Sequence, residues 1–254
     1  MLKIKKKLFF ILVLGGILCV SAQNYPEMVK IEGGSYMMGD EKKIGAANER
    51  PVHKVTINTF YISKTEVTVA QYRAYCEAKG IEMPIQPWEE NDNNPIANVS
   101  WTDAIGYTEW LSKKIGQEVR LPYEAEWEYA AKGGSKSKSY IYSGSDDLQE
   151  VAWFEDNSGE QVHPVASKKA NELGLYDMSG NVWEWCMDKY DKDFYAKSKV
   201  INNPKGGVEG DRHTLRGGAW FYKPTYCRVT FRSNATPDYI SPVFGFRVVS
   251  VSEN

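Results

Sequence analysis

The sequence predicts an α+β fold with little regular secondary structure. Only three segments have the pattern of a helix, and beyond residue 134 clusters of turn-forming residues (SGSDD, EDNSGE, NNPKGG and SNATPD) divide the chain into short pieces. The chain also contains 8 Trp and 16 Tyr. We therefore expect a largely aromatic core in which the polar tips of these side chains are hydrogen bonded.

The N-terminal residues have the pattern of a secretory signal peptide. Four lysines among residues 3–7 precede an apolar run, 8–20, and the small residues Ser21 and Ala22 follow it. The run is about 13 residues long, short of the roughly 20 that a membrane-spanning helix requires. We therefore expect a signal peptide at residues 1–22, export to the periplasm or the cell exterior, and no membrane span after cleavage.

The sequence supports neither a lipid anchor nor a nucleic-acid ligand. The bulky Leu18 precedes Cys19, where lipoprotein processing needs a small residue, so we expect no lipid anchor at Cys19. Cleavage leaves 27 basic and 33 acidic residues, a net charge of about −6. Such a chain offers no basic surface for nucleic acid.

Residues 23–254 are predicted to form a single domain, because no segment has the composition of a linker and no repeat is visible. Its first clear element is 52–62, VHKVTINTFYI, in which apolar and polar residues alternate. This period predicts one half-buried strand.

Two helices have signals at both ends. Thr68 and Gln71 form a capping box that opens a helix running toward Gly80. Ser100 is the predicted N-cap of a second helix, and Gly116 follows the last apolar residue of its periodic pattern.

A third helix is predicted to open at Pro122, in PYEAEWEYAAKGG, and to end at the glycine pair 133–134. Acidic residues fill its first turns, where the positive end of the helix dipole favours them. The segments after it are predicted to be short strands and long turns.

Three cysteines remain after cleavage, Cys76, Cys186 and Cys227. In an oxidising compartment this odd number allows one disulfide and one free thiol, three free thiols, or an intermolecular bridge. The oligomeric state stays equally open.

Seven blocks in order along the chain resemble those of the formylglycine-generating enzyme (sulfatase-modifying factor) family. They are IEGGSYMMGD (31–40), TEVTVAQYRAY (65–75), NVSWTDA (98–104), RLPYEAEWEYAAKGG (120–134), GLYDMSGNVWEW (174–185), RGGAW (216–220) and FGFRVV (244–249).

The resemblance implies a variant of the C-type-lectin fold. Enzymes of the family use oxygen and copper held by two cysteines to oxidise a sulfatase cysteine to formylglycine. Relatives with the same blocks include sulfoxide-forming and siderophore-maturing proteins, ligand-displaying proteins, and lipoproteins of secretion and gliding machinery, so the fold does not fix the function.

The sequence departs from the enzymes at the two cysteine positions, which are Tyr222 and Cys227 here, and Ala219 stands where the enzymes usually carry serine. Cu(I) needs two soft thiolates in a near-linear arrangement, so we do not expect copper. Cys227 remains the candidate catalytic residue if a nearby group lowers its pKa. The alternative is a structural role, as a buried thiol or disulfide with Cys186.

The resemblance also implies a structural calcium site. Matched residue by residue, its ligands are the side chains of Asp177 and Glu184 and the carbonyls of Gly180 and Val182. Two carboxylates and two carbonyls are suitable donors for this hard cation. The alternative is that Glu184 pairs with an arginine such as Arg216 and that Asp177 caps a turn.

The histidines at 53, 163 and 213 have no metal-binding spacing, and most tryptophans are expected in the core.

The sequence leads to two functional hypotheses. The first is a divergent or noncatalytic exported member that binds a protein or peptide ligand in the groove where the enzymes hold substrate, for example within a secretion or surface machinery. The second is an oxygen-dependent oxidoreductase, through formylglycine formation or another oxidation.

Overall fold

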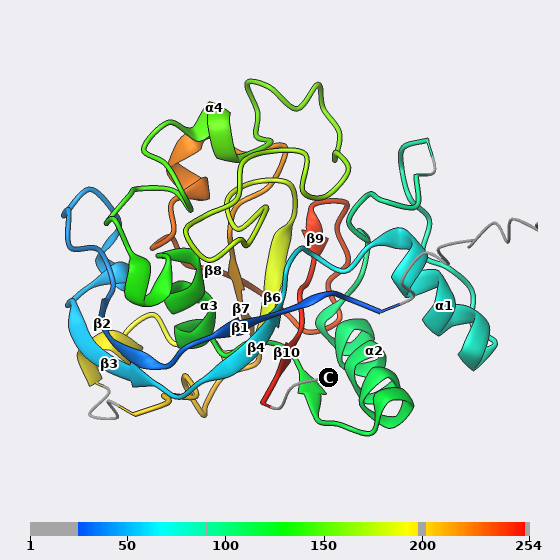
Figure 1. Cartoon of the computed structure of the whole chain (residues 1–254), viewed down its shortest axis with the longest axis horizontal. Coiled ribbons are helices and arrows are strands. Elements are labelled where there is room, and N and C mark those ends of the chain that lie inside the picture. The colour runs from blue at the N-terminus through cyan, green and yellow to red at the C-terminus, as the bar shows by residue number, and fades with distance from the viewer. Residues whose placement is uncertain (1–24, 90, 198–201, 252–254) are drawn as a thin grey trace, which may run out of the picture.

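The computed structural model describes residues 25–89, 91–197 and 202–251 (Figure 1). The predicted signal peptide and the last three residues lie outside this part. Helices account for 23% and strands for 20% of the residues that the structure describes, which agrees with the predicted low content of regular structure.

Three small sheets organise the described chain. The first contains β1 (Met28–Ile31), β4 (Phe60–Ser63), β10 (Val249–Ser250) and β5 (Val119–Arg120), in the order β1-β4-β10-β5. The second pairs β2 (Gly34–Met38) with β3 (His53–Ile57). The third contains β8 (Ser233–Ala235), β7 (His213–Arg216), β6 (Trp183–Lys189) and β9 (Phe244–Gly245), in the order β8-β7-β6-β9.

The prediction of a single strand over 52–62 is wrong in the number of strands. It is two strands, β3 and β4, which belong to different sheets. The break falls at Asn58 and Thr59, whose polar groups bond to segments distant in the sequence: the Asn58 amide donates to Asn203 Oδ1 at 2.8 Å, and Thr59 Oγ1 accepts from the Gly33 amide at 3.1 Å. The alternating pattern continues through the break and therefore did not reveal it.

The first two predicted helices are confirmed, caps included. Helix α1 (Val69–Lys79) begins after Thr68, whose capping box with Gln71 is formed, and α2 (Trp101–Ile115) begins after Ser100. Gly80 and Gly116 end them in the left-handed conformation. Both helices lie together on one side of the domain (Figure 1).

The third helix, α3 (Glu124–Ala131), begins two residues after Pro122, with Tyr123 as its N-cap. All eight of its residues are buried, so its acidic residues serve as buried partners for arginines. Glu124 pairs with Arg232 at 2.7 Å and Glu128 with Arg216 at 2.6 Å.

The remaining elements are short, as predicted. They are η1 (Ala47–Glu49), η2 (Gly134–Lys136), α4 (Leu148–Val151), α5 (Phe194–Lys197) and η3 (Pro224–Cys227). The core is aromatic: Trp127, Trp183 and Trp185 are buried, and the Trp185 indole donates to the Val99 carbonyl at 3.0 Å. None of the described helices combines the length and the hydropathy of a membrane-spanning segment.

Candidate functional site

The segment between positions 222 and 227 follows a double-glycine turn at the end of β7. Gly217 and Gly218 have φ angles of +96° and +77°. A Cβ on Gly218 would lie 2.7 Å from Cys227 Sγ. The turn therefore packs directly on the candidate catalytic thiol, and only glycine fits there.

Cys227 is fully buried at the end of η3. It packs in a small apolar cluster with Leu148, Val151 and Phe154. Burial raises the pKa of its thiol to about 12, although hydrogen bonds from the backbone of Ala219 and Gly180 act in the opposite direction. At neutral pH this group is a protonated thiol without access to solvent, which is typical of a structural cysteine.

Tyr222 belongs to a different cluster. Its half-buried ring packs edge-on against Trp183 and Tyr226, with centroid separations of 5.3 Å in both cases. Burial raises the pKa of its phenol. The structure therefore places the two side chains at the family's cysteine positions in different surroundings, Cys227 against α4 and Tyr222 against the β6 tryptophan.

All three described cysteines are free thiols, and all three are buried. Cys186 lies on β6 in the cluster that contains Trp127 and Leu175, separate from that of Cys227. Of the alternatives left open by the sequence, the structure has three free thiols and no disulfide among the residues it describes.

Asp177, the first residue of the predicted calcium set, is buried and has φ +57°. Its Oδ2 accepts from the Ala166 amide at 2.8 Å, whereas its Oδ1 has no hydrogen-bond partner among the described residues. Burial raises the pKa of this carboxyl to about 6. A buried carboxylate oxygen without a partner is costly, and a bound cation would relieve that cost.

Glu184 is buried on β6 and forms an ion pair, but not with the arginine that the sequence pointed to. Arg247 donates through Nε to Oε2 at 2.6 Å and through Nη2 to Oε1 at 2.7 Å. The Trp127 indole also donates to Oε2 at 2.6 Å. Arg216 instead pairs with Glu128. Oε1 of Glu184 accepts one hydrogen bond and keeps a lone pair for a further partner.

Glu66 was not predicted by sequence reasoning, yet it holds the same loop. Its Oε1 accepts from the Val182 amide at 3.1 Å and its Oε2 from the Asn181 side chain at 2.9 Å. Burial raises the pKa of Glu66 well above its ordinary value, and the nearby charges of Asp177 and Glu184 raise it further. Only its place in the block 65–75 hinted at a role.

The residues around this loop fit a calcium ion in chemistry. Three buried carboxylates, Glu66, Asp177 and Glu184, face one guanidinium, Arg247. A dication would favour the ionised forms of Glu66 and Asp177, whose pKa values are raised by burial. No group of three or more His, Cys, Asp or Glu side chains in the described chain is arranged to hold a metal by itself, so backbone carbonyls such as those of Gly180 and Val182 would have to complete the coordination.

A hollow of about 260 Å³ opens beside Tyr222, and we call it the aromatic hollow. Its apolar walls come from four rings, and Arg212 and the strand β8 provide its polar side. The rings are Trp183, Tyr222, Tyr239 and Phe244. Cys227 is not among the described residues that line it. Tyr239 is 56% exposed, so the hollow is open to solvent.

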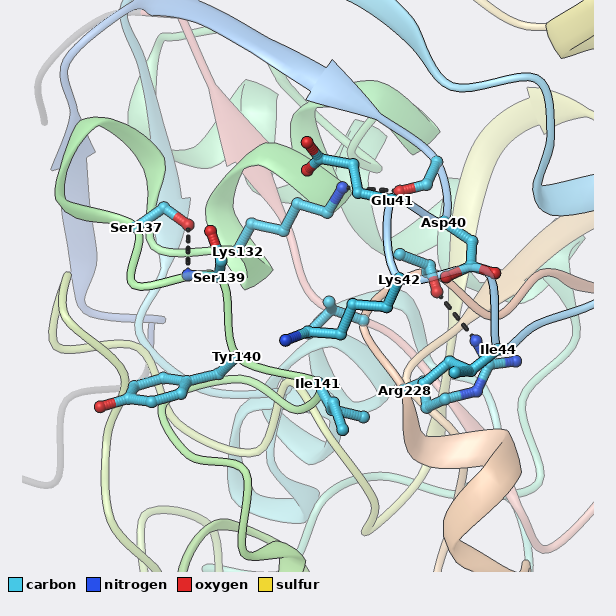
Figure 2. A pocket seen from close by; sticks show the side chains of 13 residues that line it. Asp40, Glu41, Lys42, Ile44, Lys132, Ser137, Ser139, Tyr140, Ile141 and Arg228 are labelled. Carbon is cyan, nitrogen blue, oxygen red and sulfur yellow. Dashed lines mark hydrogen bonds between the residues drawn. The ribbon is translucent and has the colours of Figure 1, made fainter.

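A second cavity, of about 180 Å³, lies between the end of β2 and the segment 137–141 (Figure 2). Two of its three cations are already used: Arg228 pairs with Glu49 at 2.7 Å, and Lys132 donates to the carbonyls of Met37 and Gly39. Lys42 reaches across the space toward Ile141 in Figure 2. Among the described residues, this cavity lacks the group of four aromatic rings that lines the aromatic hollow, and most of its cations are already bonded within the protein.

Two of the three histidines stack on tryptophans, as is typical of structural residues. His213 stacks on Trp101 at 3.8 Å and contacts the Met187 carbonyl through Nδ1 at 3.1 Å. His163 stacks on Trp153 at 3.7 Å.

Three features define the class to which this domain belongs: small sheets joined by long irregular segments, the loop 177–184, and the double-glycine turn packed on Cys227. The last two lie in the blocks 174–185 and 216–220, which resemble those of the formylglycine-generating enzyme family. The chain belongs to the sulfatase-modifying factor family, since residues 18–251 match the model of the Sulfatase-modifying factor enzyme 1-like domain.

Curated relatives include formylglycine-generating enzymes and longer kinase proteins. The chain is 32% identical to the formylglycine-generating enzyme of Streptomyces coelicolor, over 86% of this chain and 87% of that enzyme. It is 33% identical to the serine/threonine-protein kinase pkn1 of Chlamydia caviae, over 88% of this chain but only 38% of the kinase. The second match therefore concerns one part of a longer protein.

Solved structures include close neighbours. PvdO from Pseudomonas aeruginosa superimposes with a TM-score of 0.79 at 28% identity, covering 91% of this chain and 96% of PvdO. Treponema denticola variable protein 1 gives 0.77 at 27% identity, covering 89% and 95%. These agreements confirm the predicted fold class.

Proposed function

We propose that this chain is an exported, divergent member of the family that binds a protein or peptide ligand in the aromatic hollow and does not act as a copper oxidase. One observation carries the proposal. The enzymes' first cysteine position holds the phenol of Tyr222, and the remaining thiol, Cys227, is fully buried with a pKa of about 12.

Copper chemistry requires two thiolates that reach the same ion. Cys227 Sγ is covered by Gly218 and by the α4 cluster, and it donates to the Lys223 carbonyl at 3.9 Å. A substrate in the aromatic hollow meets Tyr222 instead of this thiol. The residues that line the aromatic hollow therefore support binding of a ligand better than oxidation of a substrate thiol.

Calcium is proposed as a structural ion in the loop 177–184, held by Asp177, Glu184 and the carbonyls of Gly180 and Val182. Glu66 holds this loop through Asn181 and Val182. The ion would fix the turn that packs against the double-glycine segment, because the Gly180 amide donates to the Gly217 carbonyl at 2.8 Å.

An anaerobic Cu(I) titration against a competing chelator tests the proposal. We expect no stoichiometric, tight binding by the full chain. Tyr222→Cys restores the second thiol and is the matched positive variant, while Cys227→Ser is the negative one. Tight one-to-one binding by the unmodified chain that disappears in Cys227→Ser would overturn the proposal.

The similarity to formylglycine-generating enzymes favours an oxidoreductase as the second candidate. Incubation with oxygen, Cu(I) and a cysteine-containing sulfatase peptide, followed by mass spectrometry, tests it directly. Conversion of the peptide thiol to an aldehyde would establish the oxidoreductase function. It would also show that ligand binding is not the full function of the chain.

A further inference from the structure

We propose that the ligand of the aromatic hollow is an extended peptide segment that adds as a fifth strand to the edge of β8 and places an acidic side chain against Arg212. This inference rests on the proposed binding function and specifies its partner.

The edge of a sheet borders the hollow. β8 is the terminal strand in the order β8-β7-β6-β9, and it pairs with β7 from Leu215↔Ser233 to His213↔Ala235. Among the described residues, no strand pairs with its other side. Alternate N–H and C=O groups of an edge strand point away from its neighbour and are available to an incoming strand.

The hollow lies along this edge. Ser233, Asn234 and Ala235 all line it, and the next residue, Thr236, lines both this hollow and a neighbouring one of about 370 Å³. A peptide that pairs with β8 would therefore run through two adjoining depressions. Such a continuous track fits an extended chain.

The size of the hollow favours a side chain over a whole small molecule. Its volume of about 260 Å³ is below the roughly 300–1,000 Å³ of typical small-molecule sites. Tyr222 and Tyr239 expose ring surface there, over Trp183 and Phe244. In a paired strand every second side chain points to one face, so one apolar side chain of the peptide would enter the rings.

The charge of Arg212 selects an acidic neighbour. Its side chain is exposed, its Nη1 donates to Asn234 Oδ1 at 3.0 Å, and no ion pair is formed with it in the described chain. A guanidinium held in this way presents its remaining donors to a carboxylate. Asp211 and Asp238 line the neighbouring hollow and outnumber the lysine there, Lys189, so an acidic residue is directed away from that end and toward Arg212.

Selection from a phage-displayed library of random linear heptapeptides on the purified full chain tests this inference. We expect the selected peptides to share an Asp or Glu at a fixed distance from an apolar residue. The best peptide, synthesised and measured by calorimetry, should lose binding when every second amide is N-methylated, and not when the intervening amides are. This periodicity is specific to strand pairing.

Arg212→Gln keeps a donor for Asn234 and removes the charge, so it should weaken binding of the acidic peptide about tenfold. Lys223→Gln, at another exposed cation that does not line the hollow, should leave binding unchanged. Selected peptides that lack an acidic residue, or whose binding does not depend on which amides are methylated, would overturn this inference but not the proposed function. If no selected peptide loses affinity in Tyr222→Ala or Tyr239→Ala, the proposed function fails as well.

Discussion

Replacing Arg247 with methionine is expected to destabilise the fold by about 3–5 kcal/mol, the range for removing one partner of a buried ion pair. Arg247 is fully buried and makes two hydrogen bonds to Glu184 and one each to the carbonyls of Ser63 and Tyr176. Methionine fills similar volume without charge. In calcium-free buffer, Glu184 would then lie with Glu66 and Asp177 in an apolar interior with no positive partner.

This expected loss is large relative to the total free energy of unfolding. A folded domain is stable by only about 5–15 kcal/mol, so this one change removes a substantial share. Urea unfolding at pH 7, followed by tryptophan fluorescence, measures the loss, because the buried Trp127 and Trp183 report on the core.

A double variant separates charge from packing. Arg247→Met with Glu184→Gln leaves no unpaired charge at this pair, and it should recover part of the stability that the single variant loses. A loss below about 1 kcal/mol in Arg247→Met, or no recovery in the double variant, would refute the argument that this pair compensates a buried carboxylate cluster.

Three further outcomes are expected. Calcium at about 100 times its Kd should raise Tm by roughly 5 °C or more over chelator-treated protein, and Asp177→Ala should abolish the response; an unchanged Tm would remove the calcium proposal. Gly218→Ala should cost about 2–4 kcal/mol, since φ is +77° and the new Cβ meets Cys227 Sγ. Gly80→Ala, also left-handed but with open space around it, should cost only about 1 kcal/mol; equal losses in urea unfolding would contradict the contact argument. The Cys227 thiol has a pKa of about 12 when folded against 9.0 ordinarily, so the unfolded state loses its proton first as pH rises. Stability should therefore fall between pH 9 and pH 12, and Cys227→Ala should have a flatter profile in that range.

The elements that sequence reasoning predicted well are those fixed by local interactions. Helices α1 and α2 begin and end at capping residues within a few positions along the chain, so the pattern alone located Thr68, Gly80, Ser100 and Gly116. The strand predicted over 52–62 failed because its break depends on Asn203 and Gly33, which lie far from it in the sequence.

The candidate site shows the same division. The positions of Asp177, Glu184, Tyr222 and Cys227 came from motifs, but their partners did not. The arginine that pairs with Glu184 is Arg247, 63 residues away, and Glu66 reaches Val182 across 116 residues. Such pairings are chosen by packing, which no local pattern records.

The sequence by itself determined the family, the α+β character, the helix ends, and the loss of one of two thiols. Only the tertiary structure decided that Cys227 is buried with its pKa raised, that Asp177 Oδ1 lacks a partner, and that the edge of β8 borders a hollow beside Arg212. Composition and spacing act through neighbours along the chain. Burial, charge balance and an open sheet edge arise from segments that meet only when the chain is folded.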